Sequence, residues 1–176
     1  MKNWQKYAVI VTIVLFLISG AVTTYVWMWN QRPIIDFNIC GIDGSPLQTN
    51  YQIYDGSLPI YVAIDNRGDI DASICLIITV DNANITSSDP SGLDYNSNQA
   101  TLNLAVQSHS PKGYVTINIM PIGNPKNFTV SVQAIDTHDW SFPTGFIDHI
   151  GGVEWHDYTT QATYTESNTD VYLLNS

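Results

Sequence analysis

Residues 58–80 read Leu-Pro-Ile-Tyr-Val-Ala-Ile-Asp-Asn-Arg-Gly-Asp-Ile-Asp-Ala-Ser-Ile-Cys-Leu-Ile-Ile-Thr-Val, two apolar runs separated by a short polar segment. Each run alternates apolar and smaller or polar side chains with a period of two, which is the period of a β-strand. The Asn66-Arg67-Gly68 triplet between the runs has turn chemistry. The stretch therefore predicts two strands joined by a turn, each with one face directed to a core.

The same alternation recurs on both sides of this stretch, at residues 35–39, 99–107, 114–120 and 127–134. Gly-, Pro- and Asn-rich turns separate the runs, and no window after residue 33 has helical periodicity. Strands that recur every 10 to 20 residues with such turns are typical of an antiparallel sandwich. We therefore expect an all-β ectodomain, an immunoglobulin-like sandwich over residues 34–136, preceded by one transmembrane α-helix.

The turn of this stretch continues Asn66-Arg-Gly-Asp-Ile-Asp-Ala72. It resembles the link between the second and third strands of immunoglobulin-like adhesion modules of the CARDB type, which carry a similar Asn-x-Gly turn followed by Ala. The resemblance covers about 23 residues and the general strand rhythm. It implies a binding or spacer module without catalytic residues, so none is carried over.

The two cysteines, Cys40 and Cys75, lie out of phase with the core residues of their predicted strands. They are therefore expected to point away from the core, unlike the bridge of an antibody domain. We expect either a bridge on one face between neighbouring strands or two thiols covered by the C-terminal extension. A bridge over this span stabilises the fold by about 3 to 4 kcal/mol in the loop-entropy treatment.

Residues 7–29 are almost wholly apolar and carry no charged side chain. As a helix they span about 34 Å, enough to cross the hydrocarbon core of a bilayer. Lys2 and Lys6 are the only charges of the preceding stub (residues 1–6), which indicates a cytoplasmic N-terminus. Residues 30–33 then form a short tether. We expect the remaining residues to lie outside the cell, held at the cell membrane by the helix. The alternative is a secretory signal cleaved near Ser19-Gly20-Ala21, although the apolar character continues to Trp29.

Small residues of this segment, Ser19, Gly20, Thr23 and Thr24, form a predicted docking face for the helices of partner subunits. The alternative is that they have no partner, because such residues are common in any membrane helix. Beside membrane lipid, the expected partners are other membrane or envelope proteins.

Beyond Lys6 the chain has four basic residues against all 16 acidic ones, a formal charge of −12. Such a surface repels nucleic acid phosphates, so we expect no nucleic acid partner. Polarity comes instead from Asn, Ser, Thr and Tyr, a mixture that resembles glycosylated surface proteins of archaea. Asn84 and Asn127 each begin an Asn-x-Thr acceptor triplet and are candidate glycosylation sites.

The C-terminal extension, residues 137–176, breaks the strand pattern and is rich in aromatic rings. We expect it to pack on a sheet face and to end in a hairpin of residues 162–166 and 170–175. Imidazole and carboxylate groups are ligands for zinc or copper. The candidates are His138, His149, His156, Asp139 and Asp157, with Asp148 beside them, although their spacing matches no known metal motif. The competing interpretation is hydrogen bonding within turns.

Two other acidic patterns are weaker candidates for a binding site. Arg67-Gly68-Asp69 spells an integrin-type motif, but it lies where the chain needs a turn. Asp65, Asp69 and Asp71 lack the spacing of a calcium loop. The sequence shows no nucleophile motif and no phosphate loop, and no cofactor is expected.

Together these features predict a non-catalytic single-pass protein, an accessory or structural subunit of a membrane or envelope complex. One alternative is a filament subunit or filament-anchoring protein, since archaeal pilins and archaellins are similar in outline. Lys6-Tyr7-Ala8 fits the pilin processing site poorly. A second alternative is an extracellular metal-binding module.

Overall fold

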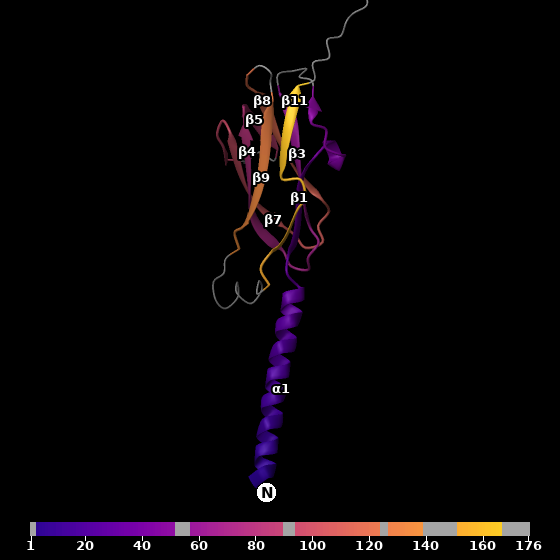
Figure 1. The fold of residues 1–176 in the computed structure, drawn as a ribbon, viewed down its shortest axis with the longest axis vertical. Coiled ribbons are helices and arrows are strands. Elements are labelled where there is room, and N and C mark those ends of the chain that lie inside the picture. The colour runs from indigo at the N-terminus through magenta and orange to yellow at the C-terminus, as the bar shows by residue number, and fades with distance from the viewer. Residues whose placement is uncertain (1–2, 52–56, 90–93, 124–126, 139–150, 167–176) are drawn as a thin grey trace, which may run out of the picture.

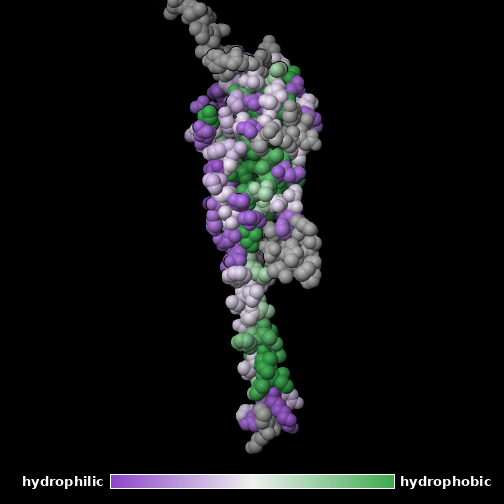
Figure 2. Space-filling view, turned by 180° about the vertical axis from the view of Figure 1, so that it is seen from behind, coloured by the Kyte–Doolittle hydropathy of each residue, from purple (hydrophilic) through white to green (hydrophobic). Residues whose placement is uncertain are grey.

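A computed structural model describes residues 3–51, 57–89, 94–123, 127–138 and 151–166 (Figure 1). The chain begins with helix α1, Asn3–Asn30, which stands apart from the rest and has no buried residue. The predicted segment of residues 7–29 lies inside it, and the helix is long and apolar enough to cross a membrane. It ends before Pro33, because proline disfavours helical geometry in the residue that precedes it. Figure 2 shows the hydrophobic surface of the helix against the mixed surface of the β domain.

Two sheets follow the helix. The five-stranded sheet has the order β10 (Glu154–Asp157), β1 (Ile34–Cys40), β3 (Leu58–Asn66), β8 (Gly113–Pro121), β5 (Ala83–Asp89). The six-stranded sheet has the order β2 (Asn50–Tyr51), β11 (Gln161–Glu166), β9 (Phe128–Asp136), β4 (Ala72–Asp81), β7 (Gln99–Val106), β6 (Asp94–Tyr95). A short 3-10 turn, Ile42–Gly44, follows β1.

The strand order is that of an immunoglobulin-like sandwich. Strands β1, β3, β8 and β5 take the places of A, B, E and D, and strands β11, β9 and β4 those of G, F and C. The inserted strands β6 and β7 widen the second sheet beyond C. Strand β10, inserted between F and G, pairs in parallel beside β1. The predicted fold class, an all-β sandwich preceded by one helix, is confirmed.

The inward side chains of both sheets form one core, and the strand patterns explain which residues enter it. Strand β4 alternates buried and less buried positions along its length, as the sequence predicts. At the end of the sandwich farther from the helix, the Phe128 ring stacks on Tyr164 at 4.8 Å between centroids, and Tyr51 lies 5.3 Å from Phe128. These rings close the core between β2, β9 and β11.

The C-terminal extension, residues 137–176, is expected to pack on a sheet face, but its described residues 151–166 contribute strands to the sheets themselves. Strands β10 and β11 are hydrogen-bonded members of the two sheets. The chain leaves the first sheet after Asp157 and enters the second at Gln161, so one segment adds the edge strand β10 to the first sheet and strand β11, between β2 and β9, to the second. Strand β11 matches the first half of the predicted hairpin, whereas residues 170–175 lie outside the described residues. The strands run along the long axis that the helix also follows (Figure 1).

Candidate functional site at the helix–sandwich junction

The connector between helix and sandwich, residues 31–33, is fixed by backbone hydrogen bonds on two sides. The amide of Glu154 donates to the carbonyl of Pro33 at 2.9 Å, and the amide of Arg67 donates to the carbonyl of Ile34 at 2.9 Å. The first bond comes from the start of β10 and the second from the turn between β3 and β4. The tether is therefore part of the sandwich and not a free link.

Two glycines let the backbone approach the connector closely. A Cβ atom at Gly68 would lie 2.4 Å from the carbonyl oxygen of Arg32 and 2.5 Å from the amide nitrogen of Ile34. A Cβ atom at Gly151 would lie 3.1 Å from the carbonyl oxygen of Trp29. Only a residue without a side chain fits at Gly68, because the neighbouring atoms are backbone and cannot move aside cheaply.

Asn66 anchors the turn from inside. It is fully buried, and its Oδ1 accepts hydrogen bonds from the amides of Gly68 at 3.0 Å and Ile34 at 3.3 Å. Its Nδ2 donates to the carbonyls of Ile70 at 2.9 Å and Val106 at 3.1 Å. One side-chain amide thus joins the start of β1, the β3–β4 turn and the end of β7, with all its hydrogen-bonding capacity used.

Charged side chains surround the same connector. Arg32 forms an ion pair with Glu154, and its guanidinium lies 5.2 Å from the ring centroid of Trp29. The His156 Nε2 lies 3.0 Å from Glu154, and Arg67 reaches both Asp36 and the His156 Nδ1 at 2.8 Å. We call Arg32, Asp36, Arg67, Glu154 and His156 the junction cluster. It links the helix end to β1, β10 and the β3–β4 turn.

The electrostatics of the cluster keep its ion pairs charged. Hydrogen bonds from Arg32 and then His156 hold the pKa of Glu154 below its ordinary value. The hydrogen bond to Asp36, together with its negative charge, raises the pKa of Arg67. Both groups are therefore ionised at neutral pH, and the cluster acts as a set of fixed contacts.

The predicted metal ligands are not brought together where the structure describes them. His156 has both ring nitrogens engaged in the junction cluster, and His138 lies at the end of β9, where its amide donates to Asp136 at 2.9 Å. Asp157 is an exposed residue at the end of β10. His149, Asp139 and Asp148 lie outside the described residues. Within the described ranges, no three His, Cys, Asp or Glu side chains converge as a metal site requires.

The predicted cysteine bridge is wrong in this structure. Cys40 lies on β1 and Cys75 on β4, which belong to different sheets, and both thiols are free. Cys75 does point outward, half-buried. Cys40 is buried, in a hollow lined by residues of the turn 41–48 and by Tyr164 of the C-terminal extension.

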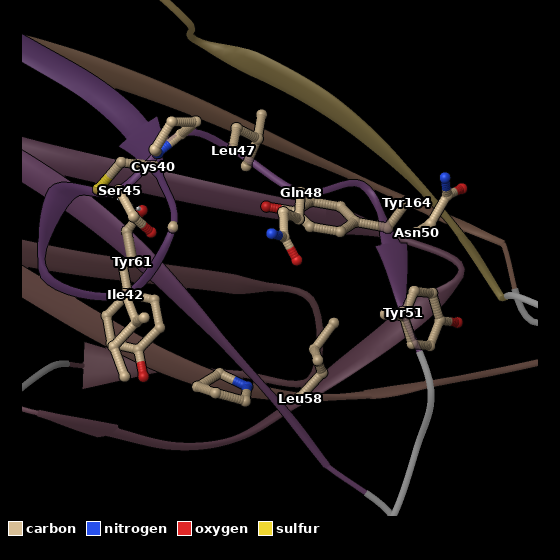
Figure 3. A pocket seen from close by; sticks show the side chains of 13 residues that line it. Cys40, Ile42, Ser45, Leu47, Gln48, Asn50, Tyr51, Leu58, Tyr61 and Tyr164 are labelled. Atoms are coloured by element: carbon tan, nitrogen blue, oxygen red, sulfur yellow. Dashed lines mark hydrogen bonds between the residues drawn. The ribbon is translucent and has the colours of Figure 1, made fainter.

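Cys40 lines a hollow of about 340 Å³ at the end of the sandwich farther from the helix, with Tyr51, Tyr61 and Tyr164 on its walls (Figure 3). Burial raises the pKa of the Cys40 thiol and of the Tyr164 hydroxyl. Both groups are therefore protonated at neutral pH, which makes the thiol a poor nucleophile and a poor metal ligand.

The remaining predicted sites lie on the surface. Asn84 is exposed on edge strand β5, whereas Asn127 is half-buried, and its Oδ1 has no hydrogen-bond partner among the described residues. On the helix, the Thr23 hydroxyl donates to the Ser19 carbonyl at 2.8 Å and the Thr24 hydroxyl donates to the Gly20 carbonyl at 2.9 Å. The hydroxyls are thus satisfied within the helix, and the small-residue face is open.

The weaker motifs have structural roles. In the Arg67-Gly68-Asp69 triplet, Arg67 pairs with Asp36 and Gly68 packs on the connector, so two of its three residues hold the turn in place. Asp69 contacts His109 at 2.9 Å, and Asp71 accepts a hydrogen bond from the Ser108 amide at 2.7 Å. These carboxylates fasten the turn between β7 and β8 to the β3–β4 turn.

The junction residues were not identified as a site from the sequence. Asp36, Arg67 and Glu154 stand far apart in the chain, and only the sheet register brings them together. The local signals at the junction are the Asn66-Arg-Gly turn, which resembles a CARDB-type turn, and His156, which the sequence offers only as a candidate metal ligand.

No protein-family model matches the chain, and no curated protein matches it. Solved structures with a similar arrangement include a complex of CaDoc0917 with CaCohA2, at 10% identity, with 76% of this chain and 99% of that chain covered and a TM-score of 0.47. A non-cellulosomal cohesin from the archaeon Archaeoglobus fulgidus has 12% identity, coverage of 79% and 94%, and a TM-score of 0.47. A CARDB domain from Pyrococcus furiosus has 9% identity, coverage of 78% and 90%, and a TM-score of 0.42. The fold assignment rests on the strand order itself.

Proposed function

We propose that this chain is a non-catalytic, single-pass membrane protein whose extracellular sandwich is an interaction module of a membrane or envelope assembly. Helix α1 serves as the retained anchor, with the N-terminus in the cytoplasm. The sandwich stands directly on the outer surface of that membrane.

The junction is the observation that carries this proposal. A signal sequence that is cleaved has no need of contacts with the mature domain. Here the last residues of the helix and the connector contact the sandwich through Gly151, Gly68 and the Arg32–Glu154 pair. These contacts favour a helix that stays attached and sets the orientation of the domain. A fixed orientation close to the bilayer suits a subunit that braces neighbouring proteins better than a receptor with long reach.

A linker insertion tests the proposal. The tagged full-length protein is purified in mild detergent, and co-purifying chains are identified by mass spectrometry. Insertion of Gly-Gly-Ser after Gln31 keeps the helix and the sandwich but separates them. We expect the wild type to retain specific membrane or envelope proteins and the insertion variant to lose most of them, with membrane retention unchanged.

The matched control is the same insertion after Gly123, between β8 and β9, at the end of the sandwich farther from the helix. Partner yield should be unaffected there. The proposal fails if no chain co-purifies with the wild type, or if the junction insertion leaves the yield of partners unchanged.

A further inference from the structure

The hollow that Cys40 lines has an apolar floor, and none of the described residues in its wall carries a charge (Figure 3). The floor consists of buried or half-buried side chains: Cys40, Leu47, Tyr51, Leu58, Tyr61 and Tyr164. The rim is exposed and partly polar, with the amide side chains of Gln48 and Asn50. Its volume of about 340 Å³ is enough to bury several side chains of a chain segment. An uncharged apolar segment enters such a hollow at the lowest cost in desolvation.

The chain leaves strand β11 at the wall of this hollow. Tyr164 lines the hollow, and Glu166, the last residue of β11, pairs in register with Tyr51, which lines it as well. Residues 171–174, outside the described residues, have the sequence Val-Tyr-Leu-Leu. Outside the helix and strands that the structure describes, the sequence has no other run of four apolar residues. Residues 167–170 are the only link between this run and β11, so the run begins within about 17 Å of Glu166.

Strand β11 itself has no free edge where a hairpin with residues 170–175 would start. Strand β9 pairs with Gln161–Tyr164 on one side of β11, and β2 pairs with Thr165 and Glu166 on the other side. The apolar run therefore has to find another surface or remain in water. Burial of a Val or Leu side chain is favoured by roughly 1.5 to 3 kcal/mol over exposure, so an apolar surface within reach is the preferred place.

We propose that residues 171–174 dock in this hollow of their own chain, with their aliphatic side chains against Leu47 and Leu58. Tethering selects this occupant over a segment of another protein, because a short flexible link gives the run an effective concentration in the millimolar range at the hollow. Charge agrees with this choice, since the nearest charged residues of the sequence, Glu166 and Asp170, precede the run and need not enter the hollow. The inference goes beyond the proposed function and does not depend on the membrane anchor.

Hydrogen exchange of the full-length protein in mild detergent, followed by mass spectrometry, tests the docking. Leu173→Asp combined with Leu174→Asp makes burial of the run costly. This variant should exchange the amides of residues 41–51, which line the hollow, about tenfold faster than the wild type. The matched control, Asn175→Asp combined with Ser176→Asp, adds the same charge but keeps the apolar run. Its exchange at the same amides should stay within about twofold of the wild type.

A cross-link distinguishes the chain's own run from that of a second copy. In a background of Cys40→Ala and Cys75→Ala, a short bismaleimide should join Gln48→Cys on the rim to Asn175→Cys within one chain. Addition of the two aspartates in the run should slow this reaction by about tenfold. The proposal is overturned if both aspartate variants exchange alike, if the run variant exchanges like the wild type, or if the cross-link joins two chains. These outcomes leave the proposed function intact, whereas a mature chain without α1 removes the proposed function and leaves the docking intact.

Discussion

Replacement of Asn66 is the sharpest test of how the junction is held together. Asn66→Ala removes the side-chain amide that satisfies the amides of Ile34 and Gly68 and the carbonyls of Ile70 and Val106. Asn66 is fully buried and Gly68 is buried, whereas Ile34, Ile70 and Val106 are half-buried, so the four backbone groups lose their partner in a site that bulk water enters only in part. The variant should loosen the connector and the β3–β4 turn together.

The magnitude follows from the number of groups left without partners. Each buried unsatisfied group costs about 1 to 3 kcal/mol. The costs do not add fully, because a cavity the size of an amide admits water and the turn relaxes. We expect Asn66→Ala to lower the free energy of unfolding by about 3 to 5 kcal/mol.

Urea unfolding of the full-length chain in detergent, followed by near-UV circular dichroism, measures the effect. Asn103→Ala is the matched control, because Asn103 is an exposed asparagine on β7 and its loss should change stability by less than about 0.5 kcal/mol. A loss below about 1 kcal/mol for Asn66→Ala would refute the reasoning.

Asn66→Asp separates the acceptor from the donor function of the same side chain. The carboxylate still accepts from the two amides but faces the carbonyls of Ile70 and Val106 without a proton to donate. Burial and these carbonyls raise the folded-state pKa of the new carboxyl above its unfolded value of about 3.9. The deficit relative to wild type should therefore be smallest below about pH 4 and should grow as pH rises through the folded-state pKa. A deficit that does not vary with pH would show that the donor bonds are unimportant.

Three further outcomes are expected. Gly68→Ala should lower the free energy of unfolding by about 1 to 3 kcal/mol in thermal unfolding, because its Cβ would meet backbone atoms. Gly113→Ala is the control and should not destabilise the protein, because the nearest atom to its Cβ would be 3.8 Å away. Equal effects of the two variants would contradict the close-packed connector. Because the pKa of Glu154 is lowered, this carboxylate stabilises the folded protein above its ordinary pKa of about 4.3, and the stabilisation is lost as pH falls through the folded-state pKa. Glu154→Gln should therefore make the free energy of unfolding depend less on pH in the acid range. Asn84→Gln should remove a glycan from the intact mass of native protein, and an unchanged mass would exclude that site.

Most of the fold could be predicted because its strands are amphipathic. One face of β3 and one face of β8 are buried, and this burial is what the alternation at residues 58–64 and 114–120 reflects. Strand β5 was missed. Its outward residues are Asn, Thr and Ser, and a bulge between Ile85 and Ser87 breaks the period of two. The two-residue strands β2 and β6 are too short to carry a period.

The site could not be predicted, because its parts are joined by register and not by sequence. Asp36 meets His156 through a parallel pairing of β1 and β10, across about 120 residues of chain, and no periodicity encodes which strand lies at an edge. The cysteines show the same limit. Their outward phase was predictable for Cys75, but the assignment of β1 and β4 to different sheets was not.

External proteolysis of intact cells, followed by the mass of the fragment that stays in the membrane, addresses the central claim most directly. The account predicts a retained fragment that begins in the N-terminal stub and contains α1, with the sandwich released or degraded outside. A full-length chain protected from the protease, or a mature chain whose mass lacks α1, would contradict it.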